Sequence, residues 1–232
     1  MARLVAGLDA ERVRARLADA EERVARACGR VGRSPEEVEL LAATKYVPVE
    51  ALGVLADAGV GLVGENVAAD LEAKQDRWGD RFTWDFIGHL QSRKTKAVLP
   101  RVRLIHSVES ESVLRQIDRH ASGETPVLLE VNVAGEESKY GVRLQDVDRF
   151  LEVASEFEAV RFAGLMTMPP LAHAPEEARP YFAALRSLAE RLRAAWSPRH
   201  DFSVLSMGTS QDYEVAVEEG ATVCRLGSVL YT

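Results

Sequence analysis

Lys45 is the residue whose type and position most directly indicate chemistry. It follows the apolar run Leu40-Leu41-Ala42-Ala43-Thr44, where a solvated surface lysine is not expected. An amine at the partly dry end of a buried strand has its charged form disfavoured, which exposes the neutral nucleophile that condenses with an aldehyde. The alternative is a lysine that extends to solvent or pairs with an acid. For an arbitrary lysine this alternative is the more common outcome, and the position at a strand end lowers its weight without overturning it.

Two turns rich in glycine and serine near the end of the sequence have the composition of a phosphate site. One is Ser206-Met207-Gly208-Thr209-Ser210, and the other is Leu226-Gly227-Ser228. Glycines let backbone N–H groups approach an anion, and hydroxyl groups add further donors. Each turn follows an apolar run. The alternative for the first segment is an ordinary turn that caps a helix.

Arg225 lies inside an apolar run, between Cys224 and Leu226, so its guanidinium must point inward or be paired. Beneath a pyridine ring, a permanent cation would keep the ring nitrogen unprotonated and weaken the ring as an electron acceptor. The alternative is an internal ion pair with Glu130 or Glu65.

The histidines give weaker evidence of function than Lys45, the two turns or Arg225. His89 and His106 could reach the same region, where a structural hydrogen-bonding role is the simpler expectation, and no spacing of histidines with acidic residues predicts a metal site. The sequence assigns no role to His89 or to the basic run Arg93-Lys94-Thr95-Lys96, which has the pattern of a solvated helix face or a contact for an anionic partner. Surface positions are expected for His120, His173 and His200.

Eight apolar runs have the length and composition of strands. They cover residues 38–44, 61–64, 83–88, 102–108, 127–133, 162–168, 202–207 and 222–227. Their near-continuous hydrophobicity suits a parallel sheet covered on both faces, and the segments between them are long enough for crossover helices. Helices are expected at 49–58, 111–120, 175–196 and 211–219, the last capped by Thr209 or Ser210.

We therefore predict an α/β fold, a single-domain (β/α)8 TIM barrel over residues 1–232, with an extra amphipathic N-terminal helix at 9–32. In such a barrel, the functional residues stand at the carboxyl ends of the strands, and the loops after strands seven and eight recurrently bind phosphate. The strand ends include Lys45, Asn66, His89, Ser206 and Gly227.

Bulk composition excludes several classes of function. The formal net charge of the 232 residues is −7 and the sequence pI is about 5.4, so no basic field is available for nucleic acid or an anionic membrane. The sequence has no secretory signal and no membrane span, and its two cysteines form no disulfide framework. We expect a cytoplasmic protein and, since no domain-swapping module is evident, a monomer.

Motif segments spread along the chain resemble one known family. They are Leu41-Ala42-Ala43-Thr44-Lys45, Gly64-Glu65-Asn66, residues 84–92, Ile105-His106-Ser107-Val108, Val131-Asn132-Val133, Ser138-Lys139-Tyr140-Gly141, Gly164-Leu165-Met166, Leu205-Ser206-Met207-Gly208 and residues 223–228. Together, and in this order, they resemble the pyridoxal phosphate homeostasis protein family, whose fold is similar to the N-terminal barrel of alanine racemase. Two departures are Val67-Ala68, where many relatives have an aromatic residue, and the ending Tyr231-Thr232.

The resemblance implies that pyridoxal 5′-phosphate is the cofactor and that Lys45 holds it as a Schiff base. It also implies that Ser206, Gly227 and Ser228 hold the phosphate, that Arg225 faces the pyridine nitrogen, and that Asn66 lies near the ring. A function in intracellular vitamin B6 homeostasis follows, without established catalytic turnover and with PLP-dependent apo-enzymes as candidate partners.

Three alternatives remain. The first is a fold-type III PLP enzyme similar to an amino-acid racemase. We expect this chain to lack the β-domain that supplies the second acid or base of such a racemase. The second is an enzyme in which Lys45 forms a Schiff base with a phosphorylated sugar or keto acid. The third is a structural interaction protein that uses the basic run near Lys94 and the 175–196 helix.

Overall fold

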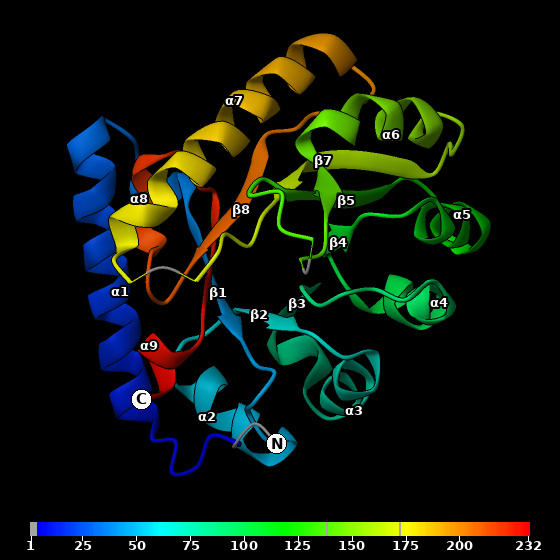
Figure 1. Ribbon diagram of the computed structural model, residues 1–232. Coiled ribbons are helices and arrows are strands. Elements are labelled where there is room, and N and C mark those ends of the chain that lie inside the picture. The colour runs from blue at the N-terminus through cyan, green and yellow to red at the C-terminus, as the bar shows by residue number, and fades with distance from the viewer. Residues whose placement is uncertain (1–3, 138, 172) are drawn as a thin grey trace.

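Eight parallel strands form a closed ring that positions the site. The computed structural model describes residues 4–137, 139–171 and 173–232, so Ser138 of the motif Ser138-Lys139-Tyr140-Gly141 lies outside it. The strands are β1 (Glu39–Ala43), β2 (Leu62–Glu65), β3 (Thr83–Phe86), β4 (Leu104–Val108), β5 (Thr125–Asn132), β7 (Val160–Met166), β8 (Val204–Thr209) and β9 (Val223–Leu226). Their order is β4-β3-β2-β1-β9-β8-β7-β5, and the pairing of β4 with β5 closes the ring. The predicted barrel is confirmed (Figure 1).

Helices surround the ring of strands (Figure 1). They are α1 (Ala10–Val31), α2 (Leu52–Asp57), α3 (Ala68–Trp78), α4 (Thr95–Val98), α5 (Glu111–His120), α6 (Val147–Ala154), α7 (Arg179–Trp196), α8 (Tyr213–Glu218) and α9 (Ser228–Tyr231). The extra N-terminal helix α1 packs against α8 and α9. A short strand, β6 (Val142–Arg143), pairs with β5 outside the ring.

Local sequence explains where several helices begin and end. Asp9 accepts a hydrogen bond from the backbone N–H of Arg12 at 2.8 Å and caps α1, and Gly32 ends that helix at φ 70°. The predicted helix at 111–120 is confirmed as α5. The helix expected at 211–219 is shorter, and Asp212 occupies its N-cap position without a side-chain cap hydrogen bond, so the expected cap at Thr209 or Ser210 is wrong. The Asp212 carboxylate accepts hydrogen bonds from Thr209, which holds the preceding residues in a turn.

The barrel interior differs from the outer core. Val127, Leu129 and Val131 of β5 belong to the large apolar cluster shared with the helices, whereas Leu128 packs inside the ring with Leu104 and Met166. Alternate residues of a strand face opposite sides, so each strand contributes one side chain in two to the interior. The interior also holds buried polar side chains, among them Asp85, His106, Ser206 and Arg225, which lie beneath the mouth of the barrel.

His200 is buried, so the expected surface position is wrong. The ring is 2% exposed and packs against Phe162, Trp196 and Phe202. Its Nδ1 accepts the backbone N–H of Phe162 at 3.4 Å. Burial lowers the pKa of His200 to about 4, so the imidazole is neutral at physiological pH.

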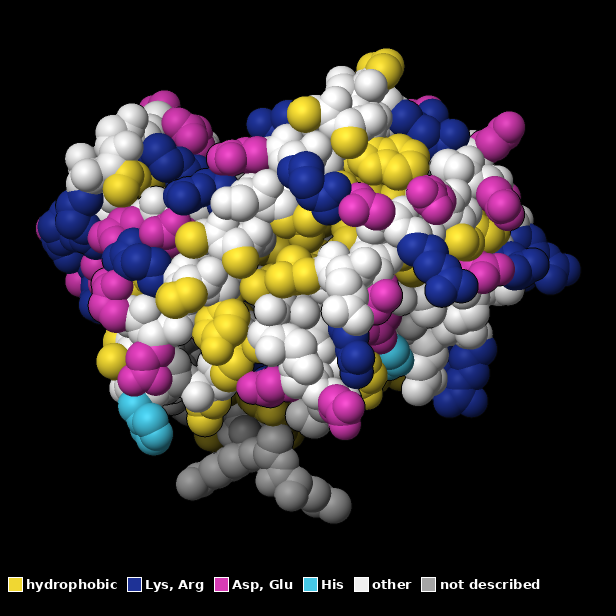
Figure 2. Space-filling view, turned by 45° about the horizontal axis from the view of Figure 1, so that its top comes forward, with side chains coloured by type: hydrophobic (Ala, Val, Ile, Leu, Met, Phe, Trp, Pro, Cys, Tyr) yellow, Lys and Arg dark blue, Asp and Glu magenta, His cyan; other side chains and the backbone are white. Residues whose placement is uncertain are grey.

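The surface carries charges of both signs. In the face shown in Figure 2, basic and acidic side chains are interspersed, with hydrophobic side chains between them. None of the described helices combines the length and apolar character that crossing a bilayer requires. Cys28 and Cys224 are both free thiols buried in the core.

Gly164→Ala is expected to destabilise the barrel by about 2 kcal/mol or more, because a Cβ at this position would lie 1.8 Å from the carbonyl oxygen of Val204 on the paired strand β8. Urea unfolding measures the change. Gly123→Ala is the matched control, since a Cβ there meets no atom within 4 Å and its cost should stay within about 0.5 kcal/mol. Equal stability of the two variants would contradict the register of β7 and β8.

Candidate functional site

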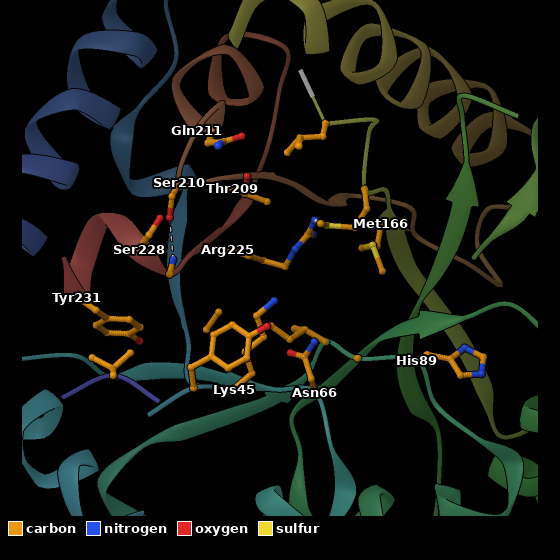
Figure 3. Close-up of a pocket in the computed structure, with 18 of the residues that line it drawn as sticks. Lys45, Asn66, His89, Met166, Thr209, Ser210, Gln211, Arg225, Ser228 and Tyr231 are labelled. Atoms are coloured by element: carbon orange, nitrogen blue, oxygen red, sulfur yellow. Dashed lines mark hydrogen bonds between the residues drawn. The ribbon is translucent and has the colours of Figure 1, made fainter. Parts of the chain in front are cut away.

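A cavity of about 710 Å³ opens at the carboxyl ends of the strands. This volume lies within the range of small-molecule sites, roughly 300–1,000 Å³. The structure brings five of the six predicted site residues to its wall: Lys45, Asn66, Arg225, Gly227 and Ser228. Figure 3 labels all of them except Gly227. The sixth, Ser206, does not line the cavity.

A buried ion pair between Glu65 and Lys74 holds the residue that follows β1. The Thr44 hydroxyl donates to Glu65 Oε1 at 2.7 Å, and Lys74 Nζ donates to the Thr44 carbonyl at 2.8 Å. Because both charges are buried and hydrogen-bonded, they fix the backbone that precedes Lys45. Breaking one partner of such a pair would leave the other charge uncompensated.

The Lys45 side chain follows this fixed backbone, lines the cavity and is exposed. Its Nζ lies 5.1 Å from the centroid of the Tyr46 ring, and no acidic side chain of the described residues forms an ion pair with it. The amine therefore lies at an open mouth and not at the partly dry one expected from the sequence. It is free to react with a ligand that enters the cavity.

The loops after β8 and β9 meet on one side of the cavity. Ser210 Oγ accepts the backbone N–H of Gly227 at 3.0 Å and that of Val229 at 3.3 Å, the first of which is drawn dashed in Figure 3. Ser228 beside them is exposed and lines the cavity. Convergent backbone N–H groups with nearby hydroxyls are the ordinary means of binding an anion. The first loop needs its glycine, because Gly208 has φ 89° and a Cβ there would lie 2.6 Å from that of Ala216.

Arg225 projects from β9 into the cavity and is only 5% exposed. Nη1 donates to the carbonyl and hydroxyl of Ser206, the former at 2.8 Å, and Nη2 donates to the Thr167 carbonyl at 2.9 Å. Arg225 forms no ion pair with Glu130 or Glu65, so that alternative is wrong. Burial lowers the pKa of Arg225, but a guanidinium remains charged in a protein.

Ser206 belongs to a hydrogen-bonded chain that crosses the barrel interior. Its hydroxyl is fully buried, accepts from Arg225 and lies 2.9 Å from His106 Nδ1. His106 Nε2 lies 3.1 Å from Asp85 Oδ2, which also accepts from Arg103 at 2.8 Å. A neutral imidazole with its proton on Nε2 satisfies both of its contacts, and burial lowers the pKa of His106 accordingly.

The structure does not bring Ser206 to the cavity wall, where the resemblance placed it as a phosphate ligand. The Ser206 side chain has no exposed surface, and its hydroxyl contacts Arg225 and His106. Ser210, which the sequence placed in the same loop, takes the position beside Gly227 and Ser228 instead. Strand alternation alone could not distinguish the two serines, because the difference depends on contacts with β4 and β9.

Two polar oxygen atoms of cavity-lining residues are buried without a hydrogen-bond partner among the described residues. They are Asn66 Oδ1 and the Tyr231 hydroxyl. Buried polar atoms are almost always satisfied, so an unsatisfied one in a cavity wall fits a group supplied by a ligand. Asn66 is held in place by the chain around it, since a Cβ on Gly88 would lie 2.1 Å from the Asn66 carbonyl.

Glu130 is a cavity residue to which the sequence gave no role beyond pairing with Arg225. It lies on β5, two residues after the inward-facing Leu128, and is 7% exposed. Burial, reinforced by the charge of Glu109, raises the pKa of Glu130 to about 7. Glu130 is a charged residue in an apolar strand, and its side chain points to the same face as that of Leu128. That pattern in the sequence could have identified it.

His89 forms the far wall of the cavity. Its ring stacks on Tyr140 with centroids 4.1 Å apart, and Nδ1 lies 2.9 Å from Glu109 Oε1. His89 reaches the mouth, as the sequence suggested, whereas His106 is buried in the interior. No group of three or more metal-ligating side chains lies within the part of the chain that the structure describes.

Comparison with known proteins first defines the class. The model of the alanine racemase N-terminal domain matches residues 49–232, so the part of the barrel from β2 onward is of this class. The strand β1 and Lys45 precede the matched residues. Two pyridoxal phosphate homeostasis proteins are similar over most of their length. That of Aquifex aeolicus (strain VF5) is 39% identical over 93% of this chain and 96% of its own, and that of Escherichia coli (strain K12) is 31% identical over 93% and 94%. The chain belongs to the pyridoxal phosphate homeostasis protein family.

Solved structures agree with this assignment. PipY of Synechococcus elongatus PCC7942 with PLP bound superposes with a TM-score of 0.81 at 30% identity, covering 95% of this chain and 100% of PipY. Alanine racemase from Corynebacterium glutamicum superposes with a TM-score of 0.70 at 16% identity, covering 100% of this chain and 63% of the racemase. The second likeness concerns the fold alone.

Glu130 is expected to make stability depend on pH. Its pKa is about 7 in the folded protein against an ordinary value of 4.5, so the fold favours the protonated form. The stability of the wild type relative to Glu130→Gln should therefore fall by about 3 kcal/mol as the pH rises from about 4.5 to about 7. Urea unfolding across this range measures it, with exposed Glu156→Gln as the control. A constant difference between wild type and Glu130→Gln would show that Glu130 titrates normally.

Proposed function

We propose that this protein binds pyridoxal 5′-phosphate at the barrel mouth, holds it as a Schiff base on Lys45 and serves PLP homeostasis. The observation that carries the proposal is that Lys45, the loops after β8 and β9, and Arg225 line one cavity. Lys45 would hold the cofactor through its aldehyde group, by a condensation with the Nζ amine that would release one water molecule. The name of the PipY structure, which states that PLP is bound, supports the choice of ligand.

The remaining residues would hold the cofactor by its polar groups. Ser228 and the Ser210 hydroxyl would donate to the phosphate oxygens, and Gly227 would position that hydroxyl, because its N–H donates to Ser210 Oγ. Arg225 would face the pyridine nitrogen, where its hydrogen bonds to Ser206 and Thr167 fix the guanidinium. The unsatisfied Asn66 Oδ1 would accept a hydrogen bond from the bound ligand. Each of these groups binds or orients, and none requires a movement of the strands.

We further propose that the protein holds the cofactor without turning over amino acids. When bound, PLP supplies an electron-accepting ring, and this capacity is greatest when the ring nitrogen is protonated. A fixed guanidinium at that nitrogen disfavours protonation, because two cations would face each other. The names of the relatives, which state homeostasis, support the same conclusion. A monomer acting in the cytoplasm, with PLP-dependent apo-enzymes as recipients of the cofactor, completes the proposal.

Borohydride reduction of protein incubated with PLP is expected to leave a phosphopyridoxyl group on the peptide that contains Lys45. Peptide mass spectrometry identifies the attachment site. Lys45→Ala should lose the label, while Lys96→Ala, which removes an exposed lysine of α4, should retain it. Labelling distributed over surface lysines, with no dependence on Lys45, would contradict the proposal.

The PLP-loaded protein is expected to racemise or decarboxylate common amino acids no more than about 10-fold faster than free PLP, because Arg225 limits the electron demand of the ring. Chiral chromatography and carbon dioxide release measure the two reactions, with free PLP at equal concentration as the control. Turnover on the order of 1 s⁻¹ or faster, which is ordinary for enzymes, would instead identify a catalyst.

A further inference from the structure

Glu130 stands apart from the other buried carboxylates of the barrel because nothing in the described residues pairs with it. Glu65 is bound by Thr44 and Lys74, and Asp85 is bound by Arg103 and His106. Glu130 is 7% exposed as a residue, lines the cavity, and forms no hydrogen bond or ion pair with any described side chain. Buried charges in proteins are normally paired, so this one indicates a partner that the protein itself does not supply.

The positive charge of Arg225 acts on Glu130, but the hydrogen-bond donors of Arg225 contact other residues. Both of its terminal nitrogens donate to Ser206, Thr167 or Met168, and no oxygen of Glu130 lies within ion-pair distance of them. The positive charge of Arg225 therefore stabilises the ionised form of Glu130 only through space, without a hydrogen bond. The Glu130 oxygens remain available to a donor in the cavity.

The surroundings of Glu130 favour a cation. The negative charge of Glu109 acts on Glu130, and Glu109 in turn pairs with His89 at 2.9 Å. His89 lies on the opposite side of Arg225 from Ser210 and Ser228 in Figure 3. The cavity thus has the hydroxyl groups of Ser210 and Ser228 on one side, and the Glu130 carboxylate elsewhere on its wall. Glu109 lies outside the lining, but its charge acts on Glu130. An anion beside Glu130 would be repelled, whereas a cation would gain from both negative charges.

We propose that the cavity has a second subsite, at Glu130, that binds the distal ammonium group of a small basic amine such as a basic amino acid or a diamine. The inference rests on the proposed function, because the amine would lie beside the cofactor on Lys45. The stacked rings of His89 and Tyr140 bound the subsite and give the methylene chain of such a ligand an apolar surface. An ammonium group supplies the donors that the Glu130 carboxylate lacks.

L-Lysine and L-norleucine provide the test, since their side chains differ chiefly by the terminal ammonium group. Equilibrium dialysis at pH 8 with radiolabelled amino acids gives both dissociation constants, with and without PLP. Wild type is expected to bind lysine at least about 10-fold more tightly than norleucine, as one charged hydrogen bond allows. Glu130→Gln should bring the ratio to within about 2-fold. Glu156→Gln, which removes an exposed negative charge elsewhere, should keep the wild-type ratio.

A second measurement keeps the test decisive if Glu130→Gln does not fold. The lysine-to-norleucine ratio of the wild type should rise about 5-fold between pH 6 and pH 8, as Glu130 ionises and the lysine side chain stays charged. The other ionisable groups that line or adjoin this part of the cavity are Glu109, His89, Arg225 and Lys45. Effects of these groups on the shared α-amino and α-carboxyl groups cancel in the ratio.

Equal affinity of the wild type for lysine and norleucine at pH 8 would overturn the subsite, and so would a preference that Glu130→Gln retains. These outcomes are distinct from failure of the proposed function. If borohydride left no label on Lys45 of the wild type, the proposed cofactor site would fail, while dialysis with the cofactor-free protein would still decide whether Glu130 selects a cation.

Discussion

A guanidinium buried inside a β-barrel must have its donors satisfied by the protein, and the interior of this barrel is organised around Arg225. Its terminal nitrogens contact residues of β8 and of the segment after β7, which orients the side chain toward the mouth. The Ser206 hydroxyl also hydrogen-bonds His106 Nδ1, and His106 Nε2 hydrogen-bonds Asp85. Arg103 closes the chain, so two cations, one carboxylate and two neutral groups share the polar interior.

This arrangement separates structural from binding roles among similar side chains. Ser206 and Ser210 are four residues apart, yet one is a buried connector and the other faces the loop after β9. Glu65 and Glu130 are both buried carboxylates, but Lys74 neutralises the first and no described side chain neutralises the second. Glu65 has its partners inside the protein and supports the site, whereas Glu130 has none among the described side chains and lines the cavity. Ser206 is buried among its partners, whereas Ser210 accepts from the backbone of the last loop and lines the cavity.

Much of the fold could be predicted because it depends on local pattern. The eight strands follow continuous apolar runs, and α1 and α5 follow from helical periodicity with clear end signals. The short helices α4 and α9 had no such signal, since four residues are too few to show a periodicity. The start of α8 was misplaced because Asp212, Ser210 and Thr209 are all good caps, and only the turn they form selects one of them.

The sequence by itself determined the barrel, the lysine at the end of the first strand, the glycine turns after the last two strands, and membership of the family. These features are local, because they need only the order of residues along the chain and the alternation within a strand. The tertiary structure decided that His200 is buried, that Ser206 contacts Arg225 and His106, and that no side chain of the described residues pairs with Glu130. Such facts depend on contacts between residues as much as 100 positions apart, and those contacts exist only once the register between neighbouring strands is fixed.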